Sequence, residues 1–194
     1  LYPMTAELWY GYGLAMGGAT AAILLHLGYL PLAAVLTYEF ARRYTPGASP
    51  WLAVALLVTM PTVIWLGSTA NTDLAIMLFV TLALYSLLRC ADTSRRHWLL
   101  LAALTLGFAL STKHLALFAL ALLCPGFLLL LRSRGASWRH AFLAALGLGV
   151  LSLLVALGGV LLVTTGVGGK ALAWLGEQFT RLRDWATKVV GGIS

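Results

Sequence analysis

Long apolar stretches, separated by short polar clusters, run through most of the chain. They cover residues Ala19–Ala41, Trp51–Leu66, Asp73–Leu88, Trp98–Leu131 and Ala141–Thr165. A transmembrane helix needs about 20 consecutive, mostly apolar residues. The pattern therefore predicts an all-α fold, a polytopic transmembrane helical bundle.

Arginines gather in the polar segments that follow the first, third and fourth stretches. They are Arg42, Arg43, Arg89, Arg95, Arg96, Arg132, Arg134 and Arg139. Cytoplasmic loops of membrane proteins carry an excess of Lys and Arg. We therefore expect these three loops to face the cytoplasm and the uncharged loop at 67–72 to face the opposite side.

The stretch Trp98–Leu131 is too long for one crossing, which takes at most about 25 residues. Its two flanks carry arginines and so belong on the same side, which requires an even number of crossings. We place the turn at Ser111-Thr112-Lys113-His114; the alternative break is Pro125-Gly126, where a proline and a glycine are adjacent. With Pro61 as a kink in the second stretch, the chain then makes about six crossings.

Both ends of the chain have the pattern of helices that lie at a membrane surface. Residues 1–18 and 170–190 place apolar side chains at helical spacing beside polar ones, and the second segment carries Lys and Arg on its opposite face. We read residues 1–194 as one membrane domain, with interfacial helices at 1–18 and 170–190 and transmembrane helices over 19–165.

Composition excludes a water-soluble domain. Hydrophobic residues make up 61% of the chain and charged residues 10%, against about 25% charged in soluble domains. Mean hydropathy is +0.92. The net charge of +7 lies in clusters between apolar stretches rather than along one face, so we expect the lipid bilayer as partner and no nucleic acid. Arginine outnumbers lysine, which suggests a GC-rich genome and hence a bacterial inner membrane.

Four ionisable residues fall at the membrane edge opposite the arginine loops: Glu7, Asp73, Lys113 and His114. An ionisable group at the centre of a transmembrane helix costs about 2.5–3.5 kcal/mol on insertion scales, so each asks for a partner, a polar cavity or a function. Asp73 could simply stabilise the positive end of a helix, and Lys113 could simply reach the membrane surface. Alternatively, Asp73 lines a polar cavity and the ammonium of Lys113 binds the phosphate of a lipid-linked substrate.

Two further polar residues have structural explanations. His26 lies within the first crossing, where we expect it to form a hydrogen bond between helices. Glu39 precedes Arg42 and Arg43 by three and four residues, a spacing typical of ion pairs along a helix.

Three segments carry a recognisable pattern, namely residues 2–8 with 21–43, residues 65–75 and residues 99–114. In this order they resemble GT-C glycosyltransferases that use polyprenyl-phosphate sugars. Residues 2–8 with 21–43 are similar to the end of their first extracytoplasmic loop and the helix after it. Trp65-Leu66-Gly67-Ser68-Thr69-Ala70-Asn71-Thr72-Asp73-Leu74-Ala75 resembles their fourth-helix region. Residues 99–114, an apolar helix followed by Ser-Thr-Lys-His, resemble their apolar helix and Thr-Lys-aromatic segment. The resemblance covers about residues 1–132.

The resemblance implies a group that includes protein mannosyltransferases and aminoarabinose transferases. It places Asp73, Lys113 and His114 near the substrate, makes Glu7 the best catalytic candidate in the chain, and implies a divalent cation near the carrier's phosphate. No metal-ligand cluster is evident in the sequence. The principal catalytic acid of these enzymes lies earlier, before the position of Leu1, so we expect the chain to be a fragment of a longer one.

The leading hypothesis is therefore a membrane glycosyltransferase core, active if the full-length chain supplies the missing catalytic loop. It would transfer a sugar from a polyprenyl-phosphate carrier to an acceptor on the extracytoplasmic face. The alternative is a non-catalytic accessory or structural transmembrane subunit of a membrane complex, packed through Gly- and Ala-rich faces. A transporter is disfavoured because few polar residues fall in mid-membrane.

Overall fold

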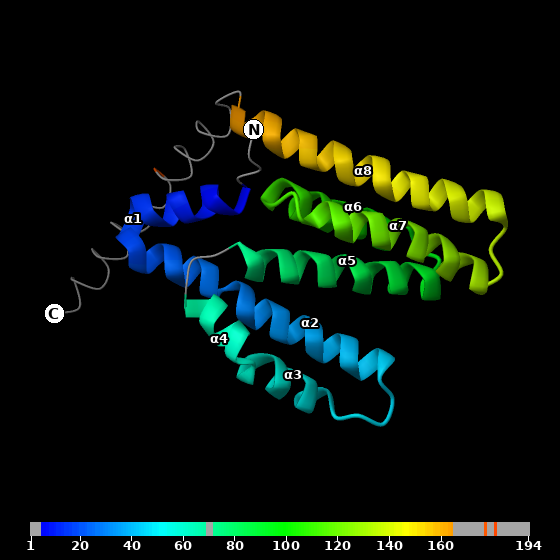
Figure 1. Ribbon diagram of the computed structural model, residues 1–194, viewed down its shortest axis with the longest axis horizontal. Helices are drawn as coiled ribbons and strands as arrows, with labels where there is room; N and C mark the ends of the chain where they lie inside the picture. Colours follow the sequence, from blue (N-terminus) through cyan, green and yellow to red (C-terminus); the bar gives the residue numbers. More distant parts are fainter. Residues whose placement is uncertain (1–4, 69–71, 165–176, 178–180, 182–194) are drawn as a thin grey trace.

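A computed structural model describes residues 5–68, 72–164, 177 and 181. Its helices are α1 (Thr5–Leu27), α2 (Tyr29–Tyr44), α3 (Pro50–Thr59), α4 (Pro61–Ser68), α5 (Asp73–Thr93), α6 (Arg96–Thr112), α7 (Ala116–Ser133) and α8 (Trp138–Thr164). The part of the chain described contains no strand, which confirms the all-α prediction. The long helices lie side by side in one elongated bundle (Figure 1).

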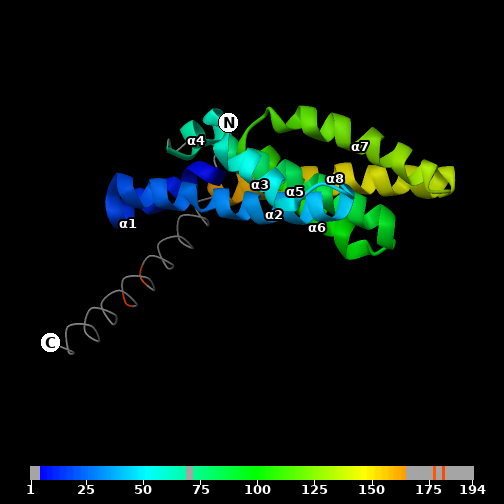
Figure 2. The same cartoon turned by 90° about the horizontal axis from the view of Figure 1, so that it is seen from below.

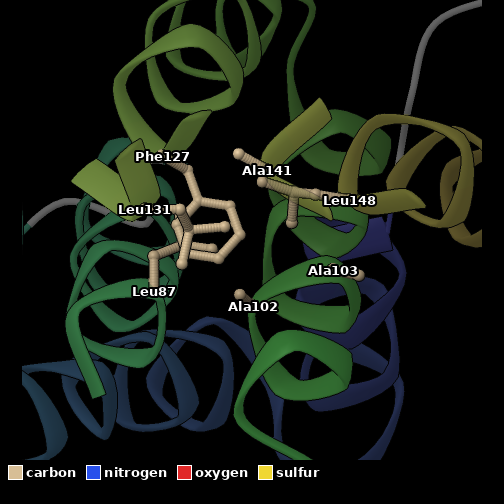
Figure 3. Packing of buried hydrophobic residues seen from close by; sticks show 7 residues of the cluster. All are labelled: Leu87, Ala102, Ala103, Phe127, Leu131, Ala141 and Leu148. Carbon is tan, nitrogen blue, oxygen red and sulfur yellow. The ribbon is translucent and has the colours of Figure 1, made fainter. Parts of the chain in front are cut away.

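The centre of the bundle is built by α5, α6 and α8, with α7 joining them toward one end. Seven buried residues form the largest core cluster (Figure 3): Leu87, Ala102, Ala103, Phe127, Leu131, Ala141 and Leu148. The alanines of α6 let the neighbouring helices approach closely, as small residues do in membranes. Figure 2 separates α7 from α6, which overlap in Figure 1, and shows α7 approaching α8 toward their shared turn.

Four helical segments are long and apolar enough to cross a membrane: Gly17–Tyr44, Asp73–Thr93, Ala116–Ser133 and Trp138–Leu161. The pair α3 and α4, bent by 60°, makes a fifth if it forms one broken span. The remaining predicted crossing corresponds to α6, whose 17 residues are at the short limit for a span. These elements follow the predicted apolar stretches in order and confirm the polytopic bundle.

The break at Pro61 is sharper than the predicted kink. Helix α3 ends at Thr59, and Met60 adopts an extended conformation with ψ of 123°. Proline disfavours the helical conformation of the residue before it and offers no N–H to the preceding turn. The second apolar stretch therefore forms two short helices at an angle.

The turn at Lys113 confirms the preferred division of the stretch 98–131. Helix α6 ends at Thr112, Lys113 is extended with φ of −157°, and α7 begins at Ala116. The alternative break was wrong, because Pro125 lies inside the continuous helix α7. Neighbouring segments in a membrane can compensate for the hydrogen bond that a helical proline removes.

The amino-terminal helix is divided at two glycines. Gly17 and Gly18 are non-helical, and Gly18 has a φ of 69°, which glycine adopts without steric penalty. Residues 5–16 therefore form a helical segment separate from the span that begins at Gly17. Their position at a membrane surface stays a prediction. The predicted interfacial helix at 170–190 lies outside the described residues, apart from Glu177 and Arg181.

The bundle has two polar ends of different composition. At one, which we call the arginine end, Asp92 of α5 accepts a hydrogen bond from Tyr44 at 2.8 Å and contacts Arg134 at 3.0 Å. The ends of α2, α5 and α7 thus meet there, as the arginine pattern predicted. Glu39 pairs with Arg42 at 2.7 Å, which confirms the predicted ion pair. Which end faces the cytoplasm stays a prediction.

Candidate functional site

The opposite end, which we call the polar end, contains the start of α5, the turn after α6, residues 5–16 and the end of α4. Here Lys113 Nζ donates a hydrogen bond to Asp73 Oδ1 at 2.7 Å, although the two residues are 40 positions apart in the chain. The side chains of Lys113 and Asp73 are 44% and 37% exposed. The ion pair therefore stays open to its surroundings, and a ligand can reach both groups.

Local structure fixes both members of the pair. Asp73 is the first residue of α5, where the positive end of the helix dipole favours a carboxylate. The preceding Thr72 makes no side-chain capping hydrogen bond, so Asp73 supplies the polar group at this terminus. The backbone N–H of Lys113 donates to the carbonyl of Ala109 at 3.1 Å. Asp73 thus has both the expected helix-end position and a lysine partner.

The end of α6 is a rigid support for Lys113. Ser111 and Thr112 are 1% and 3% exposed, and their hydroxyls donate to the carbonyl of Phe108 at 3.0 and 2.8 Å. Leu110 and Ala116, on either side of the turn, are buried in one apolar cluster. Satisfied hydroxyls and a packed turn leave little freedom to the backbone that carries the ammonium group.

His114 follows Lys113 but borders a different surface. It is exposed and lines an apolar groove between α6, α7 and α8, together with Leu110, Leu117 and Leu157. Lys113 points instead to Asp73 on α5. The structure thus brings Asp73 and Lys113 into contact and places His114 at the edge of the adjacent groove.

Glu7 lies on the exposed side of the segment 5–16. Its neighbours Ala6 and Tyr10 are buried against Ala75 of α5, two residues beyond Asp73. Among the described residues, no ion pair joins Glu7 to Lys113. The fold therefore brings the helical segment that carries Glu7 to the start of α5 without assembling the four candidate residues into one cluster.

A buried histidine connects the same region. His26 is 0% exposed; its Nδ1 lies 2.7 Å from the hydroxyl of Tyr10, and its Nε2 lies 2.7 Å from the carbonyl oxygen of Leu66 in α4. A carbonyl only accepts, so Nε2 carries the proton and Nδ1 accepts from Tyr10. This confirms the predicted hydrogen bond between helices. Its other partner, Tyr10, was not predicted, because an aromatic residue near a membrane boundary is first read as an anchor.

The hydroxyl of Tyr10 is held in its donating form. Burial, and then the nearby Tyr29 and Glu7, raise the pKa of Tyr10 above its usual range. The ring of Tyr10 also meets the ring of His26 edge to face, with 5.4 Å between their centroids. Ring packing and hydrogen bonding therefore act on the same pair.

The residues described do not fit a divalent cation. They include no group of three or more His, Cys, Asp or Glu side chains that could hold a metal ion. Asp73, the carboxylate at the start of α5, is already engaged by Lys113. Oxygen-binding cations such as Mg²⁺ prefer several oxygen ligands around one point.

Comparison with known proteins gives one family match. The family model described as dolichyl-phosphate-mannose-protein mannosyltransferase matches residues 6–158. The matched range runs from residues 5–16 into α8 and includes Glu7, Asp73, Lys113 and His114. No curated protein and no solved structure matches the chain significantly.

Proposed function

Because this chain belongs to the dolichyl-phosphate-mannose-protein mannosyltransferase family, whose members are membrane glycosyltransferases of the GT-C type, we propose that its polar end is the site of sugar transfer. The donor is a polyprenyl-phosphate sugar, and the acceptor lies on the extracytoplasmic face. The observation that supports this assignment is the contact of Lys113 with Asp73 at the end opposite the arginines.

The reaction requires positive charge at the leaving group. An acceptor hydroxyl attacks the anomeric carbon of the sugar, the bond from that carbon to the phosphate oxygen breaks, and the carrier phosphate leaves with the electron pair. The ammonium of Lys113 stabilises the charge that develops on that phosphate. Because an ammonium has three donors, Lys113 can keep Asp73 as a partner while it binds a phosphate oxygen.

Asp73 compensates the charge of Lys113 and orients its ammonium group before the donor binds. A lone ammonium at the membrane edge would be poorly solvated, and the carboxylate at 2.7 Å compensates its charge before substrate binds. The same contact fixes the direction of Nζ from the turn after α6 toward α5. Asp73 therefore acts on the phosphate through Lys113.

The acceptor hydroxyl must lose a proton to a base as it attacks. Glu7 is the exposed carboxylate on the segment that packs against the start of α5. We assign it the role of assisting acceptor deprotonation within this chain. Substitution of Glu7 should therefore reduce transfer in the assay described below.

His114 and its groove lie on the carrier side of the site. The groove is apolar, and His114 is the polar residue at its edge beside Lys113. A polyprenyl-phosphate carrier has the matching chemistry, with a hydrocarbon chain attached to a phosphate. We assign the groove to the first part of that chain and His114 to the phosphate end.

The experiment is a transfer assay on the full-length protein in lipid nanodiscs, with a labelled polyprenyl-phosphate mannose as donor. Lys113→Met keeps the length of the side chain and removes its charge, and we expect transfer to fall about 100-fold or more. Arg139→Met removes an exposed cation at the other end and is the matched control. Normal transfer by Lys113→Met would refute the assignment.

One observation favours a second function, that of a structural subunit. Asp73 and Lys113 neutralise each other, and a pair of this kind is able to act purely as a structural link between α5 and the turn after α6. In that case the geometry of the pair matters and the identity of the cation does not. Exchange of the two charges distinguishes these functions, because it keeps the pair and moves the ammonium.

A further inference from the structure

His26 joins three parts of the chain that the backbone leaves separate. Residues 5–16 are disconnected from the span by non-helical Gly17 and Gly18, and α4 is separated from α3 by the break before Pro61. The hydrogen bonds of His26 reach Tyr10 in the first segment and Leu66 in the second. Because the backbone departs from helical geometry at both junctions, the angles there depend on tertiary contacts.

Several contacts of the segment 5–16 are made by small side chains. Ala6 packs against Ala22 and Ala75, and Gly13 lies so close to Ala22 that an added Cβ would be 2.9 Å from its Cα. Alanine buries little apolar area, so such contacts permit close approach without defining one position strongly. A directional contact is added by the hydrogen bond between Tyr10 and His26, which fixes the hydroxyl of Tyr10 relative to the imidazole ring.

The geometry excludes a direct chemical role for His26. It is 0% exposed, its Nε2 proton is donated to Leu66, and its Nδ1 lone pair accepts from Tyr10. A general base must reach the proton that it removes, and neither nitrogen is available for that. Any contribution of His26 to transfer has to pass through the residues that it holds.

We propose that His26 is a positioning residue for sugar transfer, which holds the segment 5–16, and Glu7 with it, against the start of α5 beside Asp73. The role of His26 in sugar transfer rests on the proposed function. Its positioning of residues 5–16 does not. A ring with a donor on one side and an acceptor on the other is suited to this role, since it meets a hydroxyl and a carbonyl at once.

The first test measures position and does not require activity. Hydrogen–deuterium exchange of the full-length protein in nanodiscs reports on the amides of residues 5–16. Tyr10→Phe removes one hydroxyl and keeps the ring, and we expect exchange to become about 3- to 10-fold faster there, as for the loss of one hydrogen bond. His26→Leu, which removes both bonds, should have a larger effect.

Tyr44→Phe is the matched control, because it removes one hydroxyl hydrogen bond, to Asp92, at the arginine end. It should leave exchange of residues 5–16 unchanged. Unchanged exchange in Tyr10→Phe and in folded His26→Leu would overturn the proposal. If His26→Leu fails to fold, Tyr10→Phe decides alone, since its change is a single oxygen atom.

The second test connects position to the reaction. In the transfer assay, Tyr10→Phe should lower kcat about 3- to 10-fold with the donor KM unchanged, because it disturbs the Glu7 segment and leaves the Lys113 turn intact. Faster exchange with normal kcat would overturn the role in transfer. Faster exchange in a protein whose wild type transfers no sugar would uphold the positioning and refute the proposed function.

Discussion

The arginine end and the polar end are both held by polar side chains, but the surroundings of these side chains differ. At the arginine end, Arg134 and Arg42 pair with acids while their side chains are 52% and 60% exposed. At the polar end, His26 is 0% exposed and both ring nitrogens are occupied. Exposed ion pairs contribute little to stability, whereas a buried polar group that loses its partner is strongly destabilising. Equivalent substitutions should therefore have unequal effects at the two ends.

The arginine end gains further contacts from its aromatic residues. The guanidinium of Arg89 lies 5.0 Å from the ring centre of Trp98, and that of Arg132 lies 5.6 Å from the ring of Trp138. Cations over aromatic rings at a membrane boundary combine the positive charge and the aromatic belt expected there. Arg89 and Trp98 are half-buried, whereas Arg132 and Trp138 are exposed. The arginine end is therefore held by several separate contacts.

His26→Leu should show the largest effect on stability. It removes both hydrogen bonds of a fully buried side chain, and we expect a loss of about 2–3 kcal/mol. Reversible unfolding in mixed micelles measures this free energy. A loss as small as that of Tyr44→Phe, at the arginine end, would show that the two ends do not differ as argued.

Gly107→Ala should have the next largest effect. An added Cβ would lie 2.5 Å from Cβ of Val155 and 2.8 Å from the carbonyl oxygen of Ser152, so α6 and α8 must separate. Overpacking of this kind costs about 1–3 kcal/mol. The control is Gly147→Ala in α8, where an added Cβ meets nothing within 4 Å. Equal stability of the two variants would contradict the close approach of α6 to α8.

Exchange of the two charges, Asp73→Lys with Lys113→Asp, tests the polar end itself. The pair is partly exposed, so the free energy of unfolding should change by less than about 1 kcal/mol. Sugar transfer should nevertheless fall about 100-fold or more, because a carboxylate then replaces the ammonium at the turn after α6. Recovery of transfer by the double variant, from two inactive single variants, would indicate a purely structural pair.

Asp92→Asn should give the smallest effect. It removes the charge that contacts Arg134 and keeps an acceptor for Tyr44, and we expect a loss of about 0–1 kcal/mol that shrinks further in high salt. Unfolding measured at low and high ionic strength checks both the size and the salt dependence. A large loss independent of salt would mean that the arginine end is as sensitive to substitution as the buried contacts of His26.

The sequence predicted where the chain turns more accurately than what its side chains contact. It placed the turn at residues 111–114 and gathered the arginine loops at one end, and the structure confirms both. It placed Asp73 and Lys113 on the same side of the membrane but could not show that they touch. It expected a hydrogen bond from His26 to another helix, but not that Tyr10 would share it.

What the sequence determined by itself follows from fixed lengths and charge. A bilayer has one thickness and a helix one rise per residue, so apolar length and arginine placement decide the spans and their relative direction. Only the tertiary structure decided which face of each helix is inside. Leu74 is 0% exposed whereas Leu122 is 74% exposed, although both lie in apolar helices. Because lipid and core are equally apolar, no pattern of hydrophobicity separates these faces, and packing alone brings Asp73 to Lys113 and Tyr10 to His26.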